Sequence, residues 1–551
     1  MKKIILLTSL AFFIIIVLLP AIWIGVDSFF HQGHLSFESY KNVLMKNGQG
    51  IFFLNTIRLA FCATLLSLLI GVPLGFLLER VDLSFHRFVK YLYLVPLIIP
   101  PHIHAIAWIS LLGTNGFINQ FLNNLFHLET PIFTIYGLVG SVLILGLSYF
   151  PIITALTISG LRSIDQQMED AGKIITHNFD VTRRITLPLV LPHIIAGAVF
   201  VFIFSMINYG VPSLLRVNVF PVEIFAQFSA FYDSKGAVAL SMPLVLIAFI
   251  LILVQDRYMK DKSYITIGAG AKTLTRINPG NWQIAAWIFE VFIILVSVVL
   301  PITILFYEAG SLASYITAVK TAHKQILTSL GLSVIAATVA VSLSFFIAYI
   351  LEKTQWQGKG IIKLFSFLPF IVLPAILGIG MIQVWNRPQF DFIYTSSAIV
   401  VVVFMARFSP FALQAISANL RQININLEEA ACLSHVTWQD QILKILIPLA
   451  NPGLITGWIM VFILSMGELG ASLLVMPPGQ ATLSIRIYTL MHYGAGNLVA
   501  SLCLILIAIT LIPISILLLL NSWYRKSNLD RRKTYDPNTE PEKTIQKSHS
   551  A

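Results

Sequence analysis

Long, uncharged apolar stretches recur along the chain and are separated by short polar segments. Each stretch is about 20 residues long, which is the length that one α-helix needs to cross roughly 30 Å of hydrocarbon. The apolar positions are continuous rather than alternating, which argues against an outer-membrane β-barrel. The pattern predicts twelve membrane spans, at 4–26, 53–78, 89–112, 137–160, 193–215, 238–256, 282–307, 326–351, 364–385, 395–418, 453–475 and 498–521.

Composition supports the same picture. Hydrophobic residues make up 57% of the 551 residues and charged residues only 11%, and the mean hydropathy is +0.83. A soluble domain has about 45–50% apolar and about 25% charged residues. Most of this chain must therefore face lipid, and we expect an all-α integral membrane protein. The apolar run after Lys2 and Lys3 is too long for a signal peptide, so we expect it to be retained as the first span.

The net charge of +11 is unevenly distributed. With the N-terminus inside, basic residues gather in the segments assigned to the cytoplasm, such as Arg183 and Arg184 after the fourth span. The positive-inside rule then places both termini in the cytoplasm. The basic balance therefore indicates topology, and we expect no nucleic-acid partner. The three cysteines, Cys62, Cys432 and Cys503, form neither a disulfide framework nor a metal-type pair, and we expect no metal site.

The chain is a tandem repeat. Two prolines of the third span recur 273 residues later in the ninth, and two prolines near the fifth span recur 260 residues later. These pairs are Pro96 with Pro369, Pro101 with Pro374, Pro188 with Pro448, and Pro192 with Pro452. Six spans per half leave both halves in the same orientation, as a parallel repeat. We expect domains at 1–262 and 282–524, a cytoplasmic linker at 263–281, and a disordered cytoplasmic tail at 525–551.

Two predicted cytoplasmic loops, 169–188 and 429–448, match in length and in their ends. They read EDAGKIITHNFDVTRRITLP and EAACLSHVTWQDQILKILIP. Both begin with an acid and small residues and end nineteen residues later in apolar-x-apolar-Pro. They resemble the EAA loop of binding-protein-dependent ABC importer permeases, whose pattern is Glu-Ala-Ala, three residues, Gly, nine residues and Ile-x-Leu-Pro. The matching positions are Glu169, Ala171, Ile185, Leu187, Pro188, Glu429, Ala430, Ala431, Ile445, Ile447 (in place of Leu) and Pro448.

The two loops depart from the pattern in places. Asp170 replaces one Ala, and Ile175 and His435 stand where the pattern has Gly. The bend that glycine would ease must then form with another residue, or the two loops differ slightly in shape.

The resemblance implies two tandem six-helix permease domains of the type I ABC importer kind. Each loop would form a short helix that docks on a separate ATPase. Small residues at Ala171, Gly172, Ala430 and Ala431 would allow close approach, Glu169 and Glu429 would pair with a base or accept hydrogen bonds, and Pro188 and Pro448 would suit helix starts. An amphipathic interfacial helix with ordinary capping residues is the alternative for a single loop.

The resemblance also implies partners. These are two copies of an ABC ATPase subunit on the cytoplasmic side and a periplasmic or lipid-anchored solute-binding protein, with the chain in the inner (plasma) membrane. ATP and Mg²⁺ would bind to the ATPase. This chain would carry no cofactor and no catalytic residue, because GAGAKT in the linker has Ala271 where a phosphate-binding loop needs Gly.

The fused twelve-span organisation and the outer segment 476–497 resemble the ferric-iron branch of these importers, so ferric iron is the expected solute. Thiamine, 2-aminoethylphosphonate, sulfate, molybdate and polyamines are the alternatives within the same machinery. A secondary transporter driven by an ion gradient is the alternative of another class, and it would need paired acids and bases inside the membrane.

Asn208 and Glu468 occupy equivalent positions after the two loops. An ionisable residue inside a span is costly and usually faces a cavity, a pathway or a partner. Both residues are therefore expected either to line a translocation path or gate, or to be hydrated or paired near the outer interface. We expect Arg407 to snorkel or to pair with a loop acid. We expect His102 and His104 to pack or to form hydrogen bonds at a broken helix, with metal ligation as the alternative.

Overall fold

The computed structural model describes residues 2–31, 34–37, 40–41, 48–83, 86–127, 130–260, 280–424, 426–427, 433 and 436–534. Nearly all of the regular structure in these ranges is helical, and the two strands are two residues each and pair antiparallel. The prediction of an all-α membrane protein is confirmed.

The first half contains the following elements: α1 (Lys2–Phe13), η1 (Ile14–Leu18), α2 (Leu19–Asp27), β1 (Phe30–His31), β2 (His34–Leu35), α4 (Gln49–Arg80), α5 (His86–Leu92), α6 (Val95–Ile98), α7 (Pro101–Leu112), α8 (Phe117–Phe126), α9 (Leu138–Ser163), α10 (Gln166–Ile175), α11 (Asn178–Val181), η2 (Thr182–Thr186), α12 (Leu187–Met206), α13 (Gly210–Leu214), α14 (Phe220–Ser229) and α15 (Ser234–Lys260).

The second half contains η3 (Gly280–Trp282), α16 (Gln283–Ile294), η4 (Leu295–Val299), α17 (Leu300–Ala309), α18 (Leu312–Lys353), α19 (Lys359–Phe365), α20 (Leu368–Ile371), α21 (Pro374–Trp385), η5 (Pro388–Phe390), α22 (Asp391–Tyr394), α23 (Ala398–Gln422), α25 (Trp438–Asp440), η6 (Gln441–Leu446), α26 (Ile447–Met466), α27 (Ser472–Val475), α28 (Leu483–Met491) and α29 (Gly496–Thr534).

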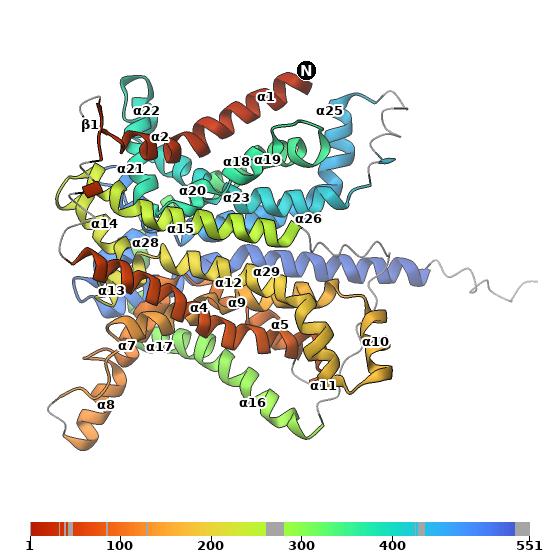
Figure 1. The fold of residues 1–551 in the computed structure, drawn as a ribbon. Helices are drawn as coiled ribbons and strands as arrows, with labels where there is room; N and C mark the ends of the chain where they lie inside the picture. Colours follow the sequence, from red (N-terminus) through yellow and green to blue (C-terminus); the bar gives the residue numbers. More distant parts are fainter. Residues whose placement is uncertain are drawn as a thin grey trace, which may run out of the picture.

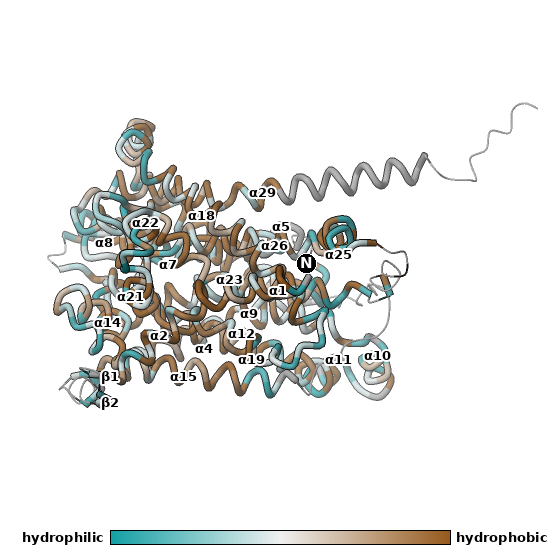
Figure 2. Tube along the Cα trace, turned by 90° about the horizontal axis from the view of Figure 1, so that it is seen from above, coloured by the Kyte–Doolittle hydropathy of each residue, from teal (hydrophilic) through white to brown (hydrophobic). Residues whose placement is uncertain are grey.

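The long helices run side by side between two polar ends (Figure 1). We call the end that carries α10, α11 and α25 the loop end, and the end that carries α8, α14 and α22 the far end. Figure 2 shows hydrophobic residues along the long helices and hydrophilic residues gathered at both ends. This is the distribution expected of helices that satisfy their own backbone inside a lipid bilayer.

The number of spans agrees with the sequence. In the described part of the chain, ten helices are long and apolar enough to cross a membrane. Two further pairs, Phe88–Ile98 with Pro101–Phe126 and Lys359–Ile371 with Pro374–Trp385, are bent by 95° and 105° at a short break. Counting each pair as one span makes twelve. Each second segment starts at a proline, whose missing N–H costs nothing in the first turn.

Two predicted spans are shifted toward the loop end. The fifth and eleventh were predicted at 193–215 and 453–475, whereas the helices are Thr182–Met206 and Trp438–Met466. The residues that follow each helix leave the helical path and form a turn, which holds Asn208 or Glu468, and a short helix, α13 or α27. The segments are apolar apart from these residues, and hydropathy alone cannot distinguish such a break from a continuing helix.

A wide π-helical segment precedes a proline at four places. The segments are η1, η2, η4 and η6, and the prolines that follow are Pro20, Pro188, Pro301 and Pro448. A proline inside a helix removes one hydrogen bond and clashes with the carbonyl of the preceding turn. A wider turn accommodates both effects without ending the helix. Pro188 and Pro448 therefore stand in the first turn of α12 and α26, where the prediction placed them, and the π-helical segments before them make each part of a longer continuous helix.

Each half is built around three tightly packed helices, α4, α9 and α12 in the first and α18, α23 and α26 in the second. Small residues allow this packing. A Cβ atom added at Gly71 would lie 2.8 Å from the carbonyl oxygen of Phe150, and one at Gly75 would lie 2.8 Å from Cβ of Thr157. The equivalent positions in α18 are Ser344 and Ala348, so the small-residue spacing is repeated.

The first span of each half packs on the other half. Helices α1 and α2 contact α18 and α21, while α17 contacts α7, and α16 contacts α4 and α5. The two halves therefore interlock. This exchange is not visible in the sequence repeat, which has no information on which copy a span contacts.

The last helix is longer than expected. Helix α29 extends to Thr534, beyond residue 525 where the disordered tail was predicted to begin. Leucine, lysine and arginine are good helix formers, and they prolong a helix that its apolar part has already started. Residues 535–551 and most of the linker, 261–279, lie outside the described residues.

Replacing Gly71 by Ala should destabilise the fold, because its Cβ would meet backbone atoms of α9 that cannot move away. We expect the free energy of unfolding to fall by about 1–3 kcal/mol, as for other overpacked cores. The matched control is Gly331→Ala in α18, where a Cβ would have nothing within 4 Å. Thermal unfolding of the purified protein in detergent should show a lower midpoint for Gly71→Ala alone. Equal midpoints would contradict the packing argument.

Candidate functional site

The first loop folds into two short helices, α10 and α11, across the loop end of the bundle (Figure 1). The carboxylate of Asp165 accepts a hydrogen bond from the backbone N–H of Gln167 at 3.1 Å and so caps the start of α10. The helix ends at Ile175, and Thr176 turns the chain with an extended backbone. The bend therefore forms without the glycine of the family pattern.

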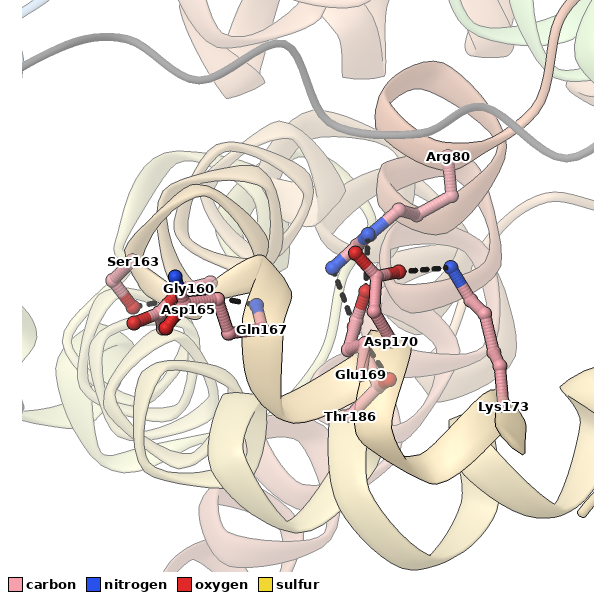
Figure 3. A network of polar contacts seen from close by, with 9 residues as sticks. All are labelled: Arg80, Gly160, Ser163, Asp165, Gln167, Glu169, Asp170, Lys173 and Thr186. Atoms are coloured by element: carbon pink, nitrogen blue, oxygen red, sulfur yellow. Dashed lines mark hydrogen bonds and ion pairs between the residues drawn. The ribbon is translucent and has the colours of Figure 1, made fainter. Parts of the chain in front are cut away.

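Glu169 is buried at the base of this loop and pairs with Arg80, the last residue of α4 (Figure 3). Arg80 donates two hydrogen bonds, from Nη1 to Oε2 at 2.7 Å and from Nη2 to Oε1 at 2.6 Å. The hydroxyl of Thr186 donates a third, to Oε1 at 2.7 Å. Glu169 is 3% exposed and Arg80 is 5% exposed. The base expected to pair with Glu169 is thus Arg80, and the pair fixes α10 against α4.

A second ion pair occurs once in each half. Arg162 donates to Glu79 at 2.9 and 2.8 Å, and Arg421 donates to Glu352 at 2.8 and 2.8 Å. The members are equivalent in the repeat and sit at the loop ends of the helices that form each three-helix core. The arginines are largely exposed, so each pair contributes little by itself. Their repetition nevertheless shows that both halves tie the same helix ends together.

Gly172 packs within the loop. A Cβ atom there would lie 2.7 Å from Cδ1 of Ile185 and 3.3 Å from Cγ2 of Val181. Its small size is therefore needed for the contact between α10 and the start of the next helix, and the expectation that it lets a partner approach is wrong. Ala171 is exposed, as are Leu187 and Pro188 farther along.

Helix α10 presents an apolar face that the sequence reasoning missed. Met168 is 50% exposed and Ile174 is 87% exposed, and Ala171 lies between them. The spacing of three residues places all three on one side of the helix. That regular spacing was the available signal. The buried Glu169 and Gly172 face the protein, so the same helix has one face toward the bundle and one apolar face toward its surroundings.

The second loop is described only in part. Glu429, Ala430, Ala431 and His435 lie outside the described residues, so their predicted roles stay predictions. Farther along, the Thr437 hydroxyl accepts a hydrogen bond from the backbone of Asp440 at 3.2 Å and caps α25. Ile445 lies in η6, and Ile447 and Pro448 begin α26, all in one continuous helix. Lys353, the equivalent of Arg80, donates to the carbonyl of Ile423 at 3.0 Å.

A cavity of about 120 Å³ lies between the two halves. Its wall is built from equivalent residues of the repeat, namely Pro101 with Pro374, Tyr149 with Phe408, Asn208 with Glu468, and Gly210 with Gly470. Because each half contributes the same positions, the cavity lies on the axis that relates the halves. The broken spans supply part of the wall, as expected where irregular backbone occurs at membrane depth.

Asn208 and Glu468 line this cavity. They also accept hydrogen bonds from the backbone at the starts of α13 and α27, the short helices that follow α12 and α26. The Asn208 amide oxygen accepts from the backbone N–H of Val211 at 3.0 Å, and its NH₂ group donates to the Tyr149 hydroxyl at 3.1 Å. The Glu468 carboxylate accepts from the backbone N–H groups of Ala471 and Ser472, each at 2.9 Å, and from the Ser472 hydroxyl. Glu468 is 5% exposed, so it lies inside the protein and not at a hydrated interface.

Arg407 lines the same cavity, and the expectation that it snorkels or pairs with a loop acid is wrong. It lies in the middle of α23, 8% exposed, and faces the other half. Neither Nε nor Nη1 has a hydrogen-bond partner among the described residues. Arg407 precedes Pro410 by three residues, just as Ser148 precedes Pro151 in the first half. The repeat could therefore have shown that Arg407 is next to the equivalent of Tyr149. His102, expected to pack or to form hydrogen bonds at the break, is also part of the wall.

Aromatic side chains from both halves contact one another on the loop-end side of the cavity. Phe204 of α12 contacts Phe370 of α20, with ring centroids 4.9 Å apart, and Phe370 contacts Phe411 of α23, also at 4.9 Å. Phe411 follows Arg407 by one turn in the direction of the loop end. These three phenylalanines therefore join the two halves on the loop-end side of the cavity.

Removing one member of the buried pair should cost more than removing both. Arg80→Met leaves the Glu169 carboxylate buried without its partner, and we expect a loss of about 3–5 kcal/mol in unfolding free energy. The double variant Arg80→Met with Glu169→Leu should recover most of that loss. Arg421→Met, at an exposed pair, is the control and should cost about 1 kcal/mol or less. Thermal unfolding in detergent measures all three, and equal losses in the single and double variants would contradict a buried pair.

Comparison with known families places the chain. The family described as "Binding-protein-dependent transport system inner membrane component" matches twice, at residues 67–264 and 340–533. Each match omits the first span of its half, the one that packs on the other half.

Individual relatives are distant but extend over most of the chain. The putative ferric transport system permease protein FbpB 1 of Haemophilus influenzae is 21% identical over 89% of this chain and 79% of its own length. The ferric transport system permease protein FbpB of Actinobacillus pleuropneumoniae is 22% identical over 84% of this chain and 69% of its own length.

A shorter relative covers only part of the chain. The molybdenum transport system permease protein ModB of Escherichia coli is 27% identical over 37% of this chain and 94% of its own length. A whole ModB chain therefore corresponds to about one half of this one, as the duplication requires. Since the family matches both halves over most of their length, the chain belongs to the binding-protein-dependent transport system inner membrane components, as a multi-pass membrane protein with two copies of the family's domain.

Proposed function

We propose that this chain is the permease subunit of an ABC importer that carries ferric iron across the inner membrane. Two copies of a separate ATPase subunit would bind at the loop end, and an extracytoplasmic solute-binding protein would deliver iron at the far end. The chain is a transport permease and is not itself an enzyme. ATP and Mg²⁺ would be held by the ATPase subunits.

The observation that carries the proposal is the family match over both halves, together with long ferric permease relatives. The basic residues at the loop end support a cytoplasmic location for that end, because cytoplasmic segments are enriched in lysine and arginine. Arg162, Arg183, Arg184 and Arg421 all lie there. Both chain termini would then be cytoplasmic.

The apolar face of α10 would be the contact for one ATPase subunit. Met168 and Ile174 expose large apolar side chains. Exposed apolar surface of this kind marks a site of contact with a partner. Glu169 would act indirectly, since its pair with Arg80 holds α10 at a fixed angle. Glu429, Ala430 and Ala431 would form the corresponding contact in the second half. The different sequences of the two loops would make the two contacts similar but not identical.

Ile174→Asp should uncouple transport without unfolding the protein, because it places a charge on the proposed contact. Burying an isoleucine in an interface is worth about 1.5–3 kcal/mol, so affinity for the ATPase should fall by about tenfold or more. The assay is ATP-driven uptake of ferric iron by proteoliposomes that contain the chain, its ATPase and its binding protein. Ile174→Leu is the conservative control and should transport normally.

Three outcomes would contradict the proposal at different levels. Normal uptake by Ile174→Asp would show that α10 is not the contact. Uptake driven by a proton gradient in the absence of ATP would show that the chain is a secondary transporter. Uptake of molybdate in place of iron, with ATP dependence intact, would keep the importer and correct the solute.

A further inference from the structure

The cavity between the halves is lined by a positively charged side chain whose hydrogen-bonding capacity is only partly filled by the described residues. Arg407 is buried and lines the cavity, and two of its nitrogen atoms have no hydrogen-bond partner among the described residues. An arginine in this state is expensive, because these two nitrogen atoms have lost water and gained no acceptor, and the contact of the guanidinium with the Phe408 ring, at 5.6 Å, supplies no hydrogen bond. Such a residue inside a membrane protein usually faces a pathway or a partner.

The acid of the cavity does not neutralise it by direct contact. Glu468 is near enough to influence Arg407 electrostatically. However, both of its carboxylate oxygens are engaged by the backbone and side chain at the start of α27. Three donors already surround the Glu468 charge, so it is stabilised locally. The guanidinium is left as the group with unfilled hydrogen-bonding capacity.

Other donors surround the same space. The Tyr149 hydroxyl accepts from Asn208, which leaves its own proton for a further acceptor. His102 is 3% exposed and lines the cavity, and its Nε2 has no partner among the described residues. In the tautomer with hydrogen on Nε2, it would donate as well. Arg407, Tyr149 and His102 come from α23, α9 and α7, so three separate helices supply donors to one volume.

We propose that this cavity is a binding site for an oxyanion, of the carboxylate or phosphate type, on the route of the transported solute. The guanidinium would supply the charge-assisted hydrogen bonds that such oxygens prefer. A volume of about 120 Å³ is several times what one water molecule needs, so a small oxyanion fits. This inference rests on the proposed function and refines it. A ferric ion would pass with its charge covered by oxyanion ligands, because Arg407 repels a bare cation.

The differences between the two copies of the repeat explain why the cavity has a single arginine. Arg407 is equivalent to Ser148, and Glu468 is equivalent to Asn208, so the first half offers neutral residues at both positions. A permease assembled from two identical subunits would place two arginines in the cavity. The fused chain places one, and the site is therefore built for a single, asymmetrically bound anion.

The test is direct binding to the full chain in lipid nanodiscs, without ATPase or binding protein. The thermal midpoint is measured against increasing sodium molybdate, sodium citrate and ferric citrate, with sodium chloride keeping ionic strength constant. We expect at least one of these to raise the midpoint in a saturable way. Stabilisation by molybdate or citrate alone indicates a free oxyanion. Stabilisation by ferric citrate alone indicates an anion carried on iron.

Arg407→Gln should weaken that binding by about tenfold or more, the loss expected for a charge-assisted hydrogen bond. Its midpoint without anion should equal or exceed that of the unmodified chain, because an unpaired buried charge has been removed. Arg387→Gln is the matched control, since Arg387 is exposed and stacks on Trp23. It should bind like the unmodified chain.

The inference is overturned if none of the three salts stabilises the unmodified chain, or if Arg407→Gln and Arg387→Gln respond alike. These results are independent of the proposed function, because no ATP is involved. Anion binding together with a failure of ATP-driven uptake would overturn only the importer. Intact uptake by Arg407→Gln would overturn only the cavity site.

Discussion

Burying a charged side chain inside a lipid-facing helical bundle is costly, and this cost governs how both functional regions are built. At the loop end the cost is offset within the chain itself. Arg80 donates two hydrogen bonds to Glu169, and Thr186 donates a third. The result is a loop fixed at one angle. In the cavity, Glu468 is satisfied by the start of α27, while two nitrogen atoms of Arg407 have no partner within the described part of the chain. The same constraint therefore produces a fixed loop in one region and, in the other, an arginine with unfilled hydrogen-bonding capacity.

The duplication is strict where it builds the scaffold and loose where it builds the sites. The pairs Glu79–Arg162 and Glu352–Arg421, the π-helical segments before prolines and the small residues between core helices all occur twice. The cavity and the loops differ between the copies. Scaffold positions are constrained in the same way in each half, because both halves must pack three helices closely. Site positions near the axis face each other, so a residue of one half can change as long as the facing residue of the other half accommodates it. Because the halves are fused in one chain, the two different halves always occur together.

Much of the architecture could be predicted from the sequence, and the failures have physical causes. Length and hydropathy were sufficient for twelve spans, and fixed spacing was sufficient for the repeat and the paired loops. Hydropathy failed at the ends of the fifth and eleventh spans, because apolar residues continue beyond the turns that hold Asn208 and Glu468 and a single polar residue does not interrupt a hydropathy window. It could not show the exchange of first spans, which depends on contacts between distant segments. Arg407 was misplaced for the same reason, because its depth in α23 is visible but the direction it faces is set by the other half.

The loop and the cavity are two ends of one helix in each half. The helix Thr182–Met206 starts beside the first loop and ends next to Asn208 in the cavity wall, and Trp438–Met466 does the same next to Glu468. The π-helical turns before Pro188 and Pro448 keep each helix continuous, so a tilt imposed at the loop end is carried along its length. Phe204 lies on the first of these helices and contacts Phe370 of the other half. Under the proposed function, opening the cavity toward the loop end would separate this aromatic contact, which would then be the barrier between a solute at Arg407 and the loop end.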